Sequence, residues 1–371
     1  MTYRISAVDV FAVRLPLREP FVISYGTFPD VPTVLVRVRT AEGAQGWGEA
    51  TPDAFVTGES YASTTATVRD LAPVFIGHDA RDLESAHREM DARVTGVPTA
   101  KAAFDIALHD LTARIAGLPV WALLGGRTKD HLAISRVVSM REPGQMAEDA
   151  AAHVAAGFRT VKIKVGSDPL LDARRVAAVR EAVGPETGIK VDVNQGWQSA
   201  GRAIAAIRAC EPYRALYFEQ PVAAWDLEGL ADVRHATGAT IMVDEGCHTA
   251  RDLLRIAGLR AADMVNIKLM KCGGLLPGVK LNAIAEAAGI GAMVGTMVES
   301  SIASAAGLHL AIALANIRNA EMGGPLLTAA DIGDAGSWYA VDRITVPDRP
   351  GLGITVDETA LKSFTEASWS Y

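Results

Sequence analysis

The chain has 371 residues, of which 49% are hydrophobic and 21% charged, a composition typical of domains with packed cores. Its formal net charge is -7 at pH 7, and acidic and basic residues are interspersed, so no basic stripe is available to neutralise phosphates or anionic lipids. Three cysteines at irregular spacing, with no apolar signal segment after Met1, lead us to expect a reduced, cytoplasmic protein with no nucleic-acid or membrane partner.

The first part of the chain predicts a compact α+β unit. Apolar and β-branched residues indicate antiparallel strands at Ile5–Leu15, Thr33–Thr40 and Ala44–Glu49, with a loop between the first two. Helical spacing follows from about residue 60 to residue 116, most clearly in Thr99–Ala116. A pair of glycines at positions 125 and 126 ends this unit.

After Arg127, short β-rich runs alternate with longer helical runs. This alternation predicts a (β/α)8 barrel of the α/β class. An open doubly wound sheet usually carries a glycine-rich phosphate turn, and neither GxGxxG nor GxxxxGK[ST] occurs; GxSxG and HExxH are absent as well. The eight predicted barrel strands are Ala133–Val138, Thr160–Val165, Ile189–Asn194, Leu216–Gln220, Thr240–Asp244, Met264–Lys268, Ala292–Gly295 and Asn319–Met322.

Charged residues gather at the ends of five consecutive predicted strands. In barrels of this kind the active site forms at the carboxyl ends of the strands, and side chains two residues apart share one face. We therefore expect these side chains to meet at one mouth of the barrel, although a single charged strand end is as often a solvated surface residue. The residues concerned are Lys162, Lys164, Asp192, Asn194, Glu219, Asp244, Glu245 and Lys268.

Three of these carboxylates predict a metal site. Asp192, Glu219 and Asp244 come from neighbouring strands, and like charges a few ångström apart cannot all stay ionised without a cation. Hard oxygen ligands favour Mg²⁺, with Mn²⁺ possible, over zinc. Asn194 and Glu245 adjoin these ligands and are expected to support them. A glycosidase acid pair would need no flanking lysines, so we disfavour that alternative.

The lysines predict proton transfer at a carbon atom. Lys164 and Lys268 lie on the second and sixth strands, so they face each other across the barrel mouth. An amine base must be neutral, and we expect the metal and the Lys162 ammonium to lower the lysine pKa. The reaction that suits this set is removal of the proton α to a substrate carboxylate, with the enediolate stabilised by the metal.

The strand-end motifs resemble those of the enolase superfamily. Lys-x-Lys, Asp-x-Asn, Glu-Gln-Pro, Asp-Glu and Asn-Ile-Lys are similar to the mandelate racemase/muconate lactonizing enzyme family, muconate-lactonizing subgroup. The resemblance extends to Phe21–Gly26, Val56–Ser60, Pro98–Ala103 and Arg349–Ile354. It implies a capping domain over residues 1–125, a catalytic barrel over residues 126–340, and a segment at 341–371 that packs back on the cap. We also expect a homo-oligomer.

The same resemblance suggests a substrate class. Residues 266–274 and 295–301 look most like racemases of N-succinylated amino acids, and next like dipeptide epimerases. Dipeptide epimerases usually carry Asp-x-Asp at the end of strand eight, where this chain has Glu321-Met-Gly323, so an N-acyl group is favoured over a dipeptide ammonium. The substrate-binding residues expected from the barrel are Thr296, Met297, Glu299, Glu321 and Gly323.

Specificity is expected to lie in two loops of the cap, Ser24–Asp30 and Pro52–Glu59. Their residues nearest the substrate side chain are expected to be Tyr25, Asp53 and Phe55, and Asp53 in the pocket would favour a cationic Arg or Lys side chain. Three alternatives stay open: a dipeptide epimerase, a lyase such as an o-succinylbenzoate synthase or muconate cycloisomerase, and a catalytically silent barrel used for binding.

Overall fold

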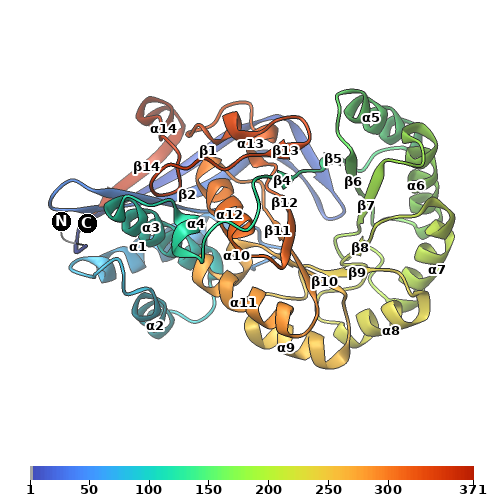
Figure 1. Ribbon diagram of the computed structural model, residues 1–371, viewed down its shortest axis with the longest axis horizontal. Coiled ribbons are helices and arrows are strands. Elements are labelled where there is room, and N and C mark those ends of the chain that lie inside the picture. Colours follow the sequence, from blue (N-terminus) through green and yellow to red (C-terminus); the bar gives the residue numbers. More distant parts are fainter. Residues whose placement is uncertain (1–2) are drawn as a thin grey trace.

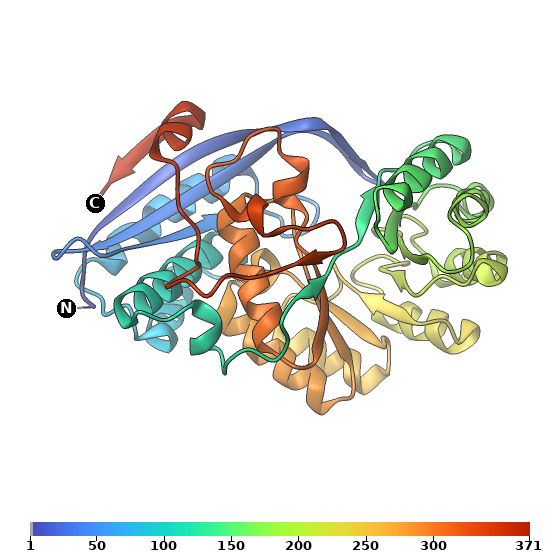
Figure 2. The same cartoon turned by 45° about the horizontal axis from the view of Figure 1, so that its top comes forward.

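The structure is a computed structural model that describes residues 3–371 (Figures 1 and 2). A four-stranded sheet has the order β14-β1-β2-β3 and joins both ends of the described chain. β14 lies antiparallel to β1, with Asp9 opposite Ser370. The last strand therefore completes the sheet that the first strands begin, and its members are β1 (Ile5–Ile23), β2 (Gly26–Thr40), β3 (Gln45–Ala50) and β14 (Thr365–Ser370).

The first two strands are longer than the sequence predicts. β1 continues beyond Leu15 to Ile23, and only Ser24 and Tyr25 form a turn before β2, so the expected loop at 24–30 is mostly strand. The pairing shifts register between Pro16 and Phe21 and then resumes, with Phe21 opposite Phe28. Prolines in this stretch hid the strand, but β14 no longer pairs with β1 here, and an edge strand tolerates proline.

A long helix covers the cap sheet. α3 (Pro98–Ala116) packs so closely on β3 that a Cβ atom at Gly46 or Gly48 would collide with the α3 backbone. Its buried face and the sheet share an apolar cluster that includes Val36, Phe104 and Leu108. The other helical segments of this part are α1 (Tyr61–Leu71), η1 (Ala72–Phe75), α2 (Leu83–Arg93) and α4 (Val120–Leu123).

Eight parallel strands form the second sheet, in the order β12-β11-β10-β9-β8-β7-β6-β5. Each of the eight predicted runs overlaps one of these strands, and the first run overlaps both β4 (Leu132–Ala133), which pairs with β13 (Arg343–Ile344), and β5. The barrel strands are β5 (Arg136–Val138), β6 (Thr160–Lys164), β7 (Gly188–Asp192), β8 (Phe218–Glu219), β9 (Ile241–Val243), β10 (Met264–Ile267), β11 (Gly291–Gly295) and β12 (Ile317–Glu321).

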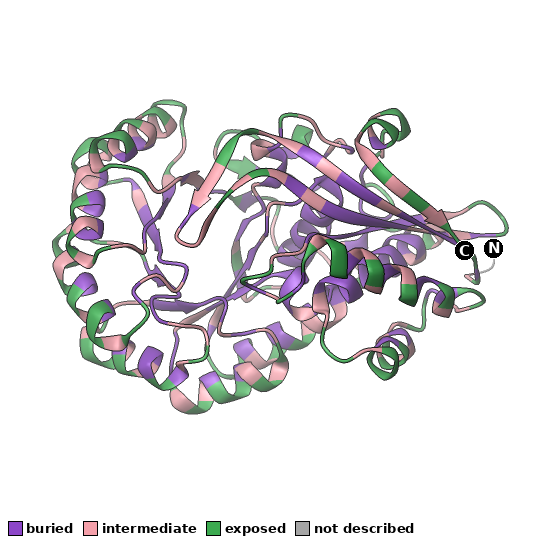
Figure 3. Ribbon diagram, turned by 180° about the vertical axis from the view of Figure 1, so that it is seen from behind, coloured by how far each residue is buried: buried purple, intermediate pink, exposed green. Residues whose placement is uncertain are grey.

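Helices follow the strands and cover the outer face of the curled sheet (Figure 1). Seen from behind, they are buried toward the strands and exposed outward (Figure 3). They are α5 (Pro143–Ala155), α6 (Pro169–Val183), α7 (Ala200–Cys210), α8 (Leu227–Thr237), α9 (Ala250–Leu259), α11 (Leu275–Ala287) and α12 (Ser301–Ala313). The remaining helical segments are α10 (Leu269–Cys272), α13 (Gly324–Leu327), α14 (Glu358–Phe364), which lies beside β14 of the cap, η2 (Glu211–Tyr213) and η3 (Ala335–Trp338). Among the described helices none is long and apolar enough to cross a membrane.

The sheet curls into a barrel whose seam lies between β5 and β12. No backbone ladder joins these two strands in the described part of the chain. A side-chain bond spans the seam instead: the Ser135 hydroxyl, just before β5, donates to Glu321 Oε1 at the end of β12, at 2.9 Å. The fold is therefore a (β/α)8-type half-barrel with an N-terminal cap, and the predicted fold class is confirmed.

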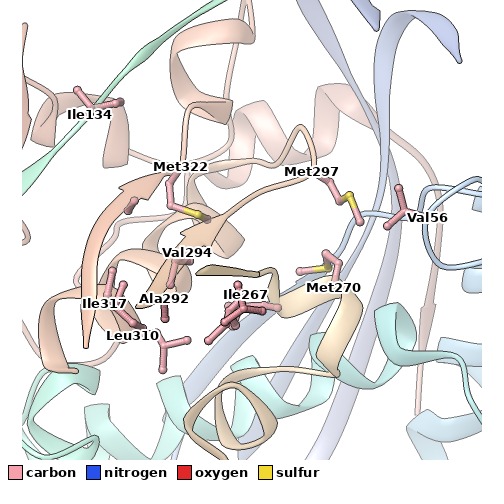
Figure 4. Close-up of a cluster of buried hydrophobic side chains, with 14 of the residues drawn as sticks. Val56, Ile134, Ile267, Met270, Ala292, Val294, Met297, Leu310, Ile317 and Met322 are labelled. Atoms are coloured by element: carbon pink, nitrogen blue, oxygen red, sulfur yellow. The ribbon is translucent and has the colours of Figure 1, made fainter. Parts of the chain in front are cut away.

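Cap and barrel interlock through apolar packing and buried carboxylates. Val56 of the cap lies near Met297 and Met270 of the barrel (Figure 4). The Glu49 carboxylate accepts from the backbone N–H groups of Ser300 and Ala303, both at 2.9 Å, at the start of α12. Unpaired N–H groups at a helix start favour an anion, so Glu49 of the cap adds to the side-chain N-cap that Ser300 already gives α12.

Candidate active site

One pocket lies between the β1–β2 hairpin of the cap and the carboxyl ends of the barrel strands. Lys164 and Lys268 both line it. Lys164 ends β6 and Lys268 follows β10, and these two strands lie four positions apart in the order of the sheet. Apolar residues of the cap, Phe21, Ile23 and Phe28, line the part nearest the hairpin. The polar residues that line the pocket are Tyr25, Asp30, Thr51, Asp53, Lys162, Lys164, Asp192, Asn194, Asn266, Lys268, Thr296 and Glu321.

Buried ion pairs join the strand ends below the pocket. The Lys162 ammonium lies 2.8 Å from Glu219 and 3.0 Å from Asp192. Lys164 lies 2.7 Å from Asp192, and Lys268 lies 2.7 Å from Asp244. Each of the three predicted metal-binding carboxylates thus contacts at least one lysine.

The pKa values of Glu219 and Asp192 are shifted in opposite directions. Burial, and then the neighbouring Asp192, raise the pKa of Glu219 to about 8. For Asp192, burial acts in the opposite direction to Lys162 and Lys164, whose charges lower its pKa below the usual value. Burial and like charge thus disfavour the ionised form of Glu219, as expected for carboxylates that need a cation.

The lowered lysine pKa that we predicted depends on a bound metal ion, and for Lys268 the charges of the protein itself act in the opposite direction. Burial favours the neutral amine, but Asp244, Glu245 and Glu219 outweigh it and raise the pKa of Lys268 above its usual value. The pKa of Lys162 is raised for the same kind of reason, with Asp192 as the leading partner after burial. The prediction counted the positive neighbours of the lysines and omitted the carboxylates that contact them.

The donor set suits a hard divalent cation. Among the described residues, no three carboxylate, imidazole or thiol groups already stand around one point at metal-binding distances; the Lys162 ammonium contacts Asp192 and Glu219 instead. Metal binding therefore requires these ammonium contacts to be exchanged for the ion. In that exchange the ion would replace ammonium groups as the counter-charge of Asp192 and Glu219, within a cluster of five lysines and five carboxylates: Lys162, Lys164, Lys190, Lys268 and Lys271 with Asp192, Glu219, Asp244, Glu245 and Glu321.

Asn194 and Glu245 adjoin the lysine on β6 and the acids. The Asn194 side chain accepts from Lys164 Nζ at 3.0 Å and donates to Glu245 Oε1 at 3.2 Å. Burial and Asp244 raise the pKa of Glu245 to about 7. The two residues thus form a bonded chain that starts at the Lys164 ammonium and orients it.

The three predicted residues of the cap occupy different positions. Tyr25 and Asp53 line the pocket, and the Tyr25 hydroxyl donates to Asp53 Oδ2 at 2.9 Å. Phe55 is 67% exposed, packs its ring on Tyr25 at 4.9 Å between centroids, and is not among the described lining residues. Asp30, which the sequence interpretation did not single out, also lines the pocket and pairs with Arg14 at 2.8 Å.

The predicted residues on the last two strands also divide. Thr296, Met297, Glu321 and Gly323 line the pocket. Glu299 is buried behind it, where it accepts from the Met297 N–H at 3.1 Å, and burial followed by the charge of Glu49 raises its pKa to about 8. The two oxygens of Glu321 lie 2.7 Å from Lys162 and 2.7 Å from Lys190, so this residue is a counter-ion inside the barrel.

Three further residues complete the network. Asn266 donates to Glu219 Oε1 at 2.9 Å, and Lys271 lies 2.6 Å from Asp244. Lys190 also donates to the Ser135 hydroxyl at the seam. Asn266 and Lys190 could have been identified, because each precedes a predicted site residue, Lys268 or Asp192, by two residues. Lys271 lies in α10 and carries no comparable signal.

Comparison with known families agrees with this site. Residues 5–125 match the mandelate racemase/muconate lactonizing enzyme N-terminal domain, and residues 145–360 match the enolase C-terminal domain-like family. The N-succinyl-L-Arg/Lys racemase of Bacillus cereus is 44% identical over 98% of this chain and 98% of its own length. The chain belongs to the enolase superfamily. Its predicted membership of the mandelate racemase/muconate lactonizing enzyme family is confirmed.

Solved structures of enolase superfamily members have the same fold. The crystal structure of the Bacillus cereus racemase matches with a TM-score of 0.98 and 43% identity, over 99% of this chain and 100% of that one. A dipeptide epimerase from Enterococcus faecalis, complexed with Mg and L-Leu-L-Tyr, matches with a TM-score of 0.91 and 38% identity, over 95% and 99% of the two chains. These relatives place the chain among the isomerases of the superfamily.

Proposed function

We propose that the chain is an Mg²⁺-dependent racemase of N-acyl amino acids, with N-succinyl derivatives of Arg or Lys as the favoured substrates. The observation that carries the proposal is the pocket itself, which places Lys164 and Lys268 in the walls of one site with the carboxylates Asp192, Glu219 and Asp244 beneath. Similarity to a racemase of N-succinyl-Arg/Lys over nearly the whole chain supports the substrate class.

The two lysines would exchange roles between the enantiomers. For one enantiomer Lys164 removes the α-proton and Lys268 returns a proton to the opposite face of the carbon; for the other, the roles reverse. Asp192, Glu219 and Asp244 would hold Mg²⁺, which when bound would act as a Lewis acid on the developing enediolate charge. A divalent cation also offsets the carboxylates that hold the Lys268 ammonium protonated, so this amine loses its proton more readily.

Lys162 is assigned a different task. It also lines the pocket, but its ammonium contacts three carboxylates, Glu219, Asp192 and Glu321. We assign it to compensating charge as the enediolate forms, which would stabilise the transition state without a proton transfer.

The pocket charges favour a cationic side chain over a cationic amino terminus. Asp53 lies on the cap side, where its carboxylate accepts from the neutral Tyr25 hydroxyl and would attract the guanidinium or ammonium of the substrate side chain, whereas Asp30 is already paired with Arg14. At the end of β12 the Glu321 oxygens already contact Lys162 and Lys190, and Gly323 offers no charge. A dipeptide ammonium would be poorly compensated there, whereas a neutral amide suits it.

The proposal is tested by α-proton exchange in deuterated water. Purified protein with Mg²⁺ is incubated with N-succinyl-L-Arg, N-succinyl-L-Lys, N-acetyl-L-Lys and a panel of dipeptides, and exchange and optical rotation are followed by NMR and polarimetry. We expect exchange with racemisation of the N-acyl substrates, lost in excess chelator. Exchange confined to dipeptides would establish an epimerase instead, and α-proton exchange of one enantiomer without racemisation would favour a one-base lyase or cycloisomerase.

A further inference from the structure

A second pocket adjoins the active-site pocket. The two share three apolar lining residues, Phe21, Val137 and Leu327, which form the partition between them. The second pocket lies among the distal part of β1, β5 and helix α5, where the cap hairpin reaches the barrel in Figures 1 and 2. The charged residues that line it are Arg18, Glu19, Arg136, Arg141, Asp149 and His153.

Positive charge in this pocket is incompletely paired. Arg141 lies 3.1 Å from Glu19 and 3.6 Å from Asp149, so both acids are already engaged by one guanidinium. In the described residues, no carboxylate stands at ion-pair distance from Arg18 or Arg136, which we call the arginine pair. Arg136 is only partly exposed.

The surroundings of Arg136 call for an anion. Burial lowers its pKa, the positive Arg18 lowers it further, and Glu19 is the acid that opposes this shift. The positive charge of Arg136 also acts on His153 of α5: burial, and then Arg136, lower the pKa of this histidine. A half-buried guanidinium beside a second one, without its own counter-ion, is a favourable partner for a carboxylate, which it can bind through two parallel hydrogen bonds.

The active-site pocket leaves a route toward this pair. A Cβ atom built at Gly323 meets no heavy atom within 4 Å, so the wall is open at this position. Leu327, four residues further along and at the end of α13, belongs to the partition. An acyl chain that left the α-nitrogen of a bound substrate along this wall would run toward the apolar partition, beyond which Arg18 and Arg136 line the second pocket.

We propose that the arginine pair binds the distal carboxylate of a dicarboxylic N-acyl group, such as succinyl, and so makes the enzyme prefer N-succinyl over N-acetyl substrates. This inference rests on the proposed function and deepens it. The ligand class follows from the length and charge of the chain: succinyl carries a carboxylate at its end, and acetyl does not.

The test compares two ligands by their affinity ratio. Dissociation constants of N-succinyl-L-Lys and N-acetyl-L-Lys are measured calorimetrically with Mg²⁺ for the wild type and for Arg136→Gln. A charge-assisted hydrogen bond predicts that the wild type favours the succinyl ligand by about 10- to 100-fold, and that Arg136→Gln loses most of that ratio. Arg18→Gln, at an exposed side chain, provides a second variant with the same expected direction.

A matched control removes one positive charge elsewhere. Arg159 is 87% exposed at its side chain and does not line the pocket, so Arg159→Gln should keep the wild-type ratio. If Arg159→Gln and Arg136→Gln changed the affinity ratio equally, the effect would come from net charge alone and the proposal would be overturned. So would a wild-type ratio near one, or a ratio that both pocket variants preserve.

Further outcomes separate the two proposals. Exchange of the α-proton with a ratio near one overturns the arginine-pair site alone, whereas the expected ratio without exchange overturns the racemase alone. Failure of both ligands to bind overturns both. Free succinate is titrated in parallel: binding that Arg136→Gln abolishes, together with a ratio near one, would mean that the pair holds a free anion and not part of the substrate.

Discussion

A buried histidine should make folding stability depend on pH in a measurable way. His309 on α12 is fully buried; its Nδ1 accepts from the Trp121 N–H at 3.1 Å, and its Nε2 lies 3.0 Å from the Leu352 carbonyl oxygen, to which it donates. Protonation of Nδ1 would point its N–H at the backbone N–H of Trp121, so that two donors would face each other. Burial accordingly lowers the pKa of His309 to about 4, from the ordinary value of 6.5.

The sign and size of the effect follow from that shift. Because the pKa is lower in the folded state, the contribution is complete above pH 6.5 and is lost as the pH falls toward 4, where the unfolded chain binds the proton and the folded chain does not. One proton over this interval corresponds to about 3 kcal/mol of unfolding free energy, at about 1.4 kcal/mol per pH unit.

The assay is urea unfolding at a series of pH values, for the wild type and His309→Asn. The variant should be less stable at pH 8, because it loses packing, and its stability should fall less steeply between pH 6.5 and 4 by the contribution of one proton. His235→Asn, at an exposed histidine of α8, should keep the wild-type slope. Parallel curves for the wild type and His309→Asn would refute the reasoning.

Three further predictions concern the site and the seam. Glu219→Gln should keep the far-ultraviolet circular dichroism spectrum but lower α-proton exchange by at least about 100-fold, because a buried ligand to a hard cation loses its charge; full turnover, or turnover in excess chelator, would contradict the metal assignment. Asp53→Asn should lower kcat/KM for N-succinyl-Arg and N-succinyl-Lys by about 10-fold or more relative to an N-succinyl substrate with an apolar side chain; an unchanged ratio would place the cation elsewhere. Lys190→Met should destabilise the fold by about 3 kcal/mol in urea unfolding, because Glu321 loses one of two buried counter-ions; an unchanged midpoint would show that Lys162 alone suffices.

Local patterns predicted the strand ends well. A two-residue period and the rule for the carboxyl ends of barrel strands were enough to select Lys164, Asp192 and Lys268, because these side chains depend only on their own strand for direction. The same rule failed for the electrostatics of Lys268, since its pKa depends on Asp244, Glu245 and Glu219, which come from other strands. The spacing of residues along one strand does not show which side chains of other strands lie beside them.

Long-range contacts also explain the other features that the sequence did not predict. The β1–β2 hairpin extends past Pro16 because of its pairing with β2, which no local propensity reports. The seam bond from Ser135 to Glu321 joins residues at opposite ends of the barrel sequence. Phe55 differs, since it lies in the expected loop but its side chain turns outward onto Tyr25. The roles of the individual site residues, the domain limits, the oligomeric state and the cellular location stay predictions.

The central claim is that two lysines act on opposite faces of one α-carbon, and stereospecific deuterium exchange tests it most directly. Lys164→Ala and Lys268→Ala are each incubated in deuterated water with Mg²⁺ and with either enantiomer of N-succinyl-Lys, and α-proton loss is followed by NMR. Neither variant should racemise its substrate, since each lacks one proton donor. The variant that keeps Lys164 should exchange one enantiomer, and the variant that keeps Lys268 should exchange the other. Exchange of the same enantiomer by both variants would contradict the two-base account and favour a one-base lyase or cycloisomerase.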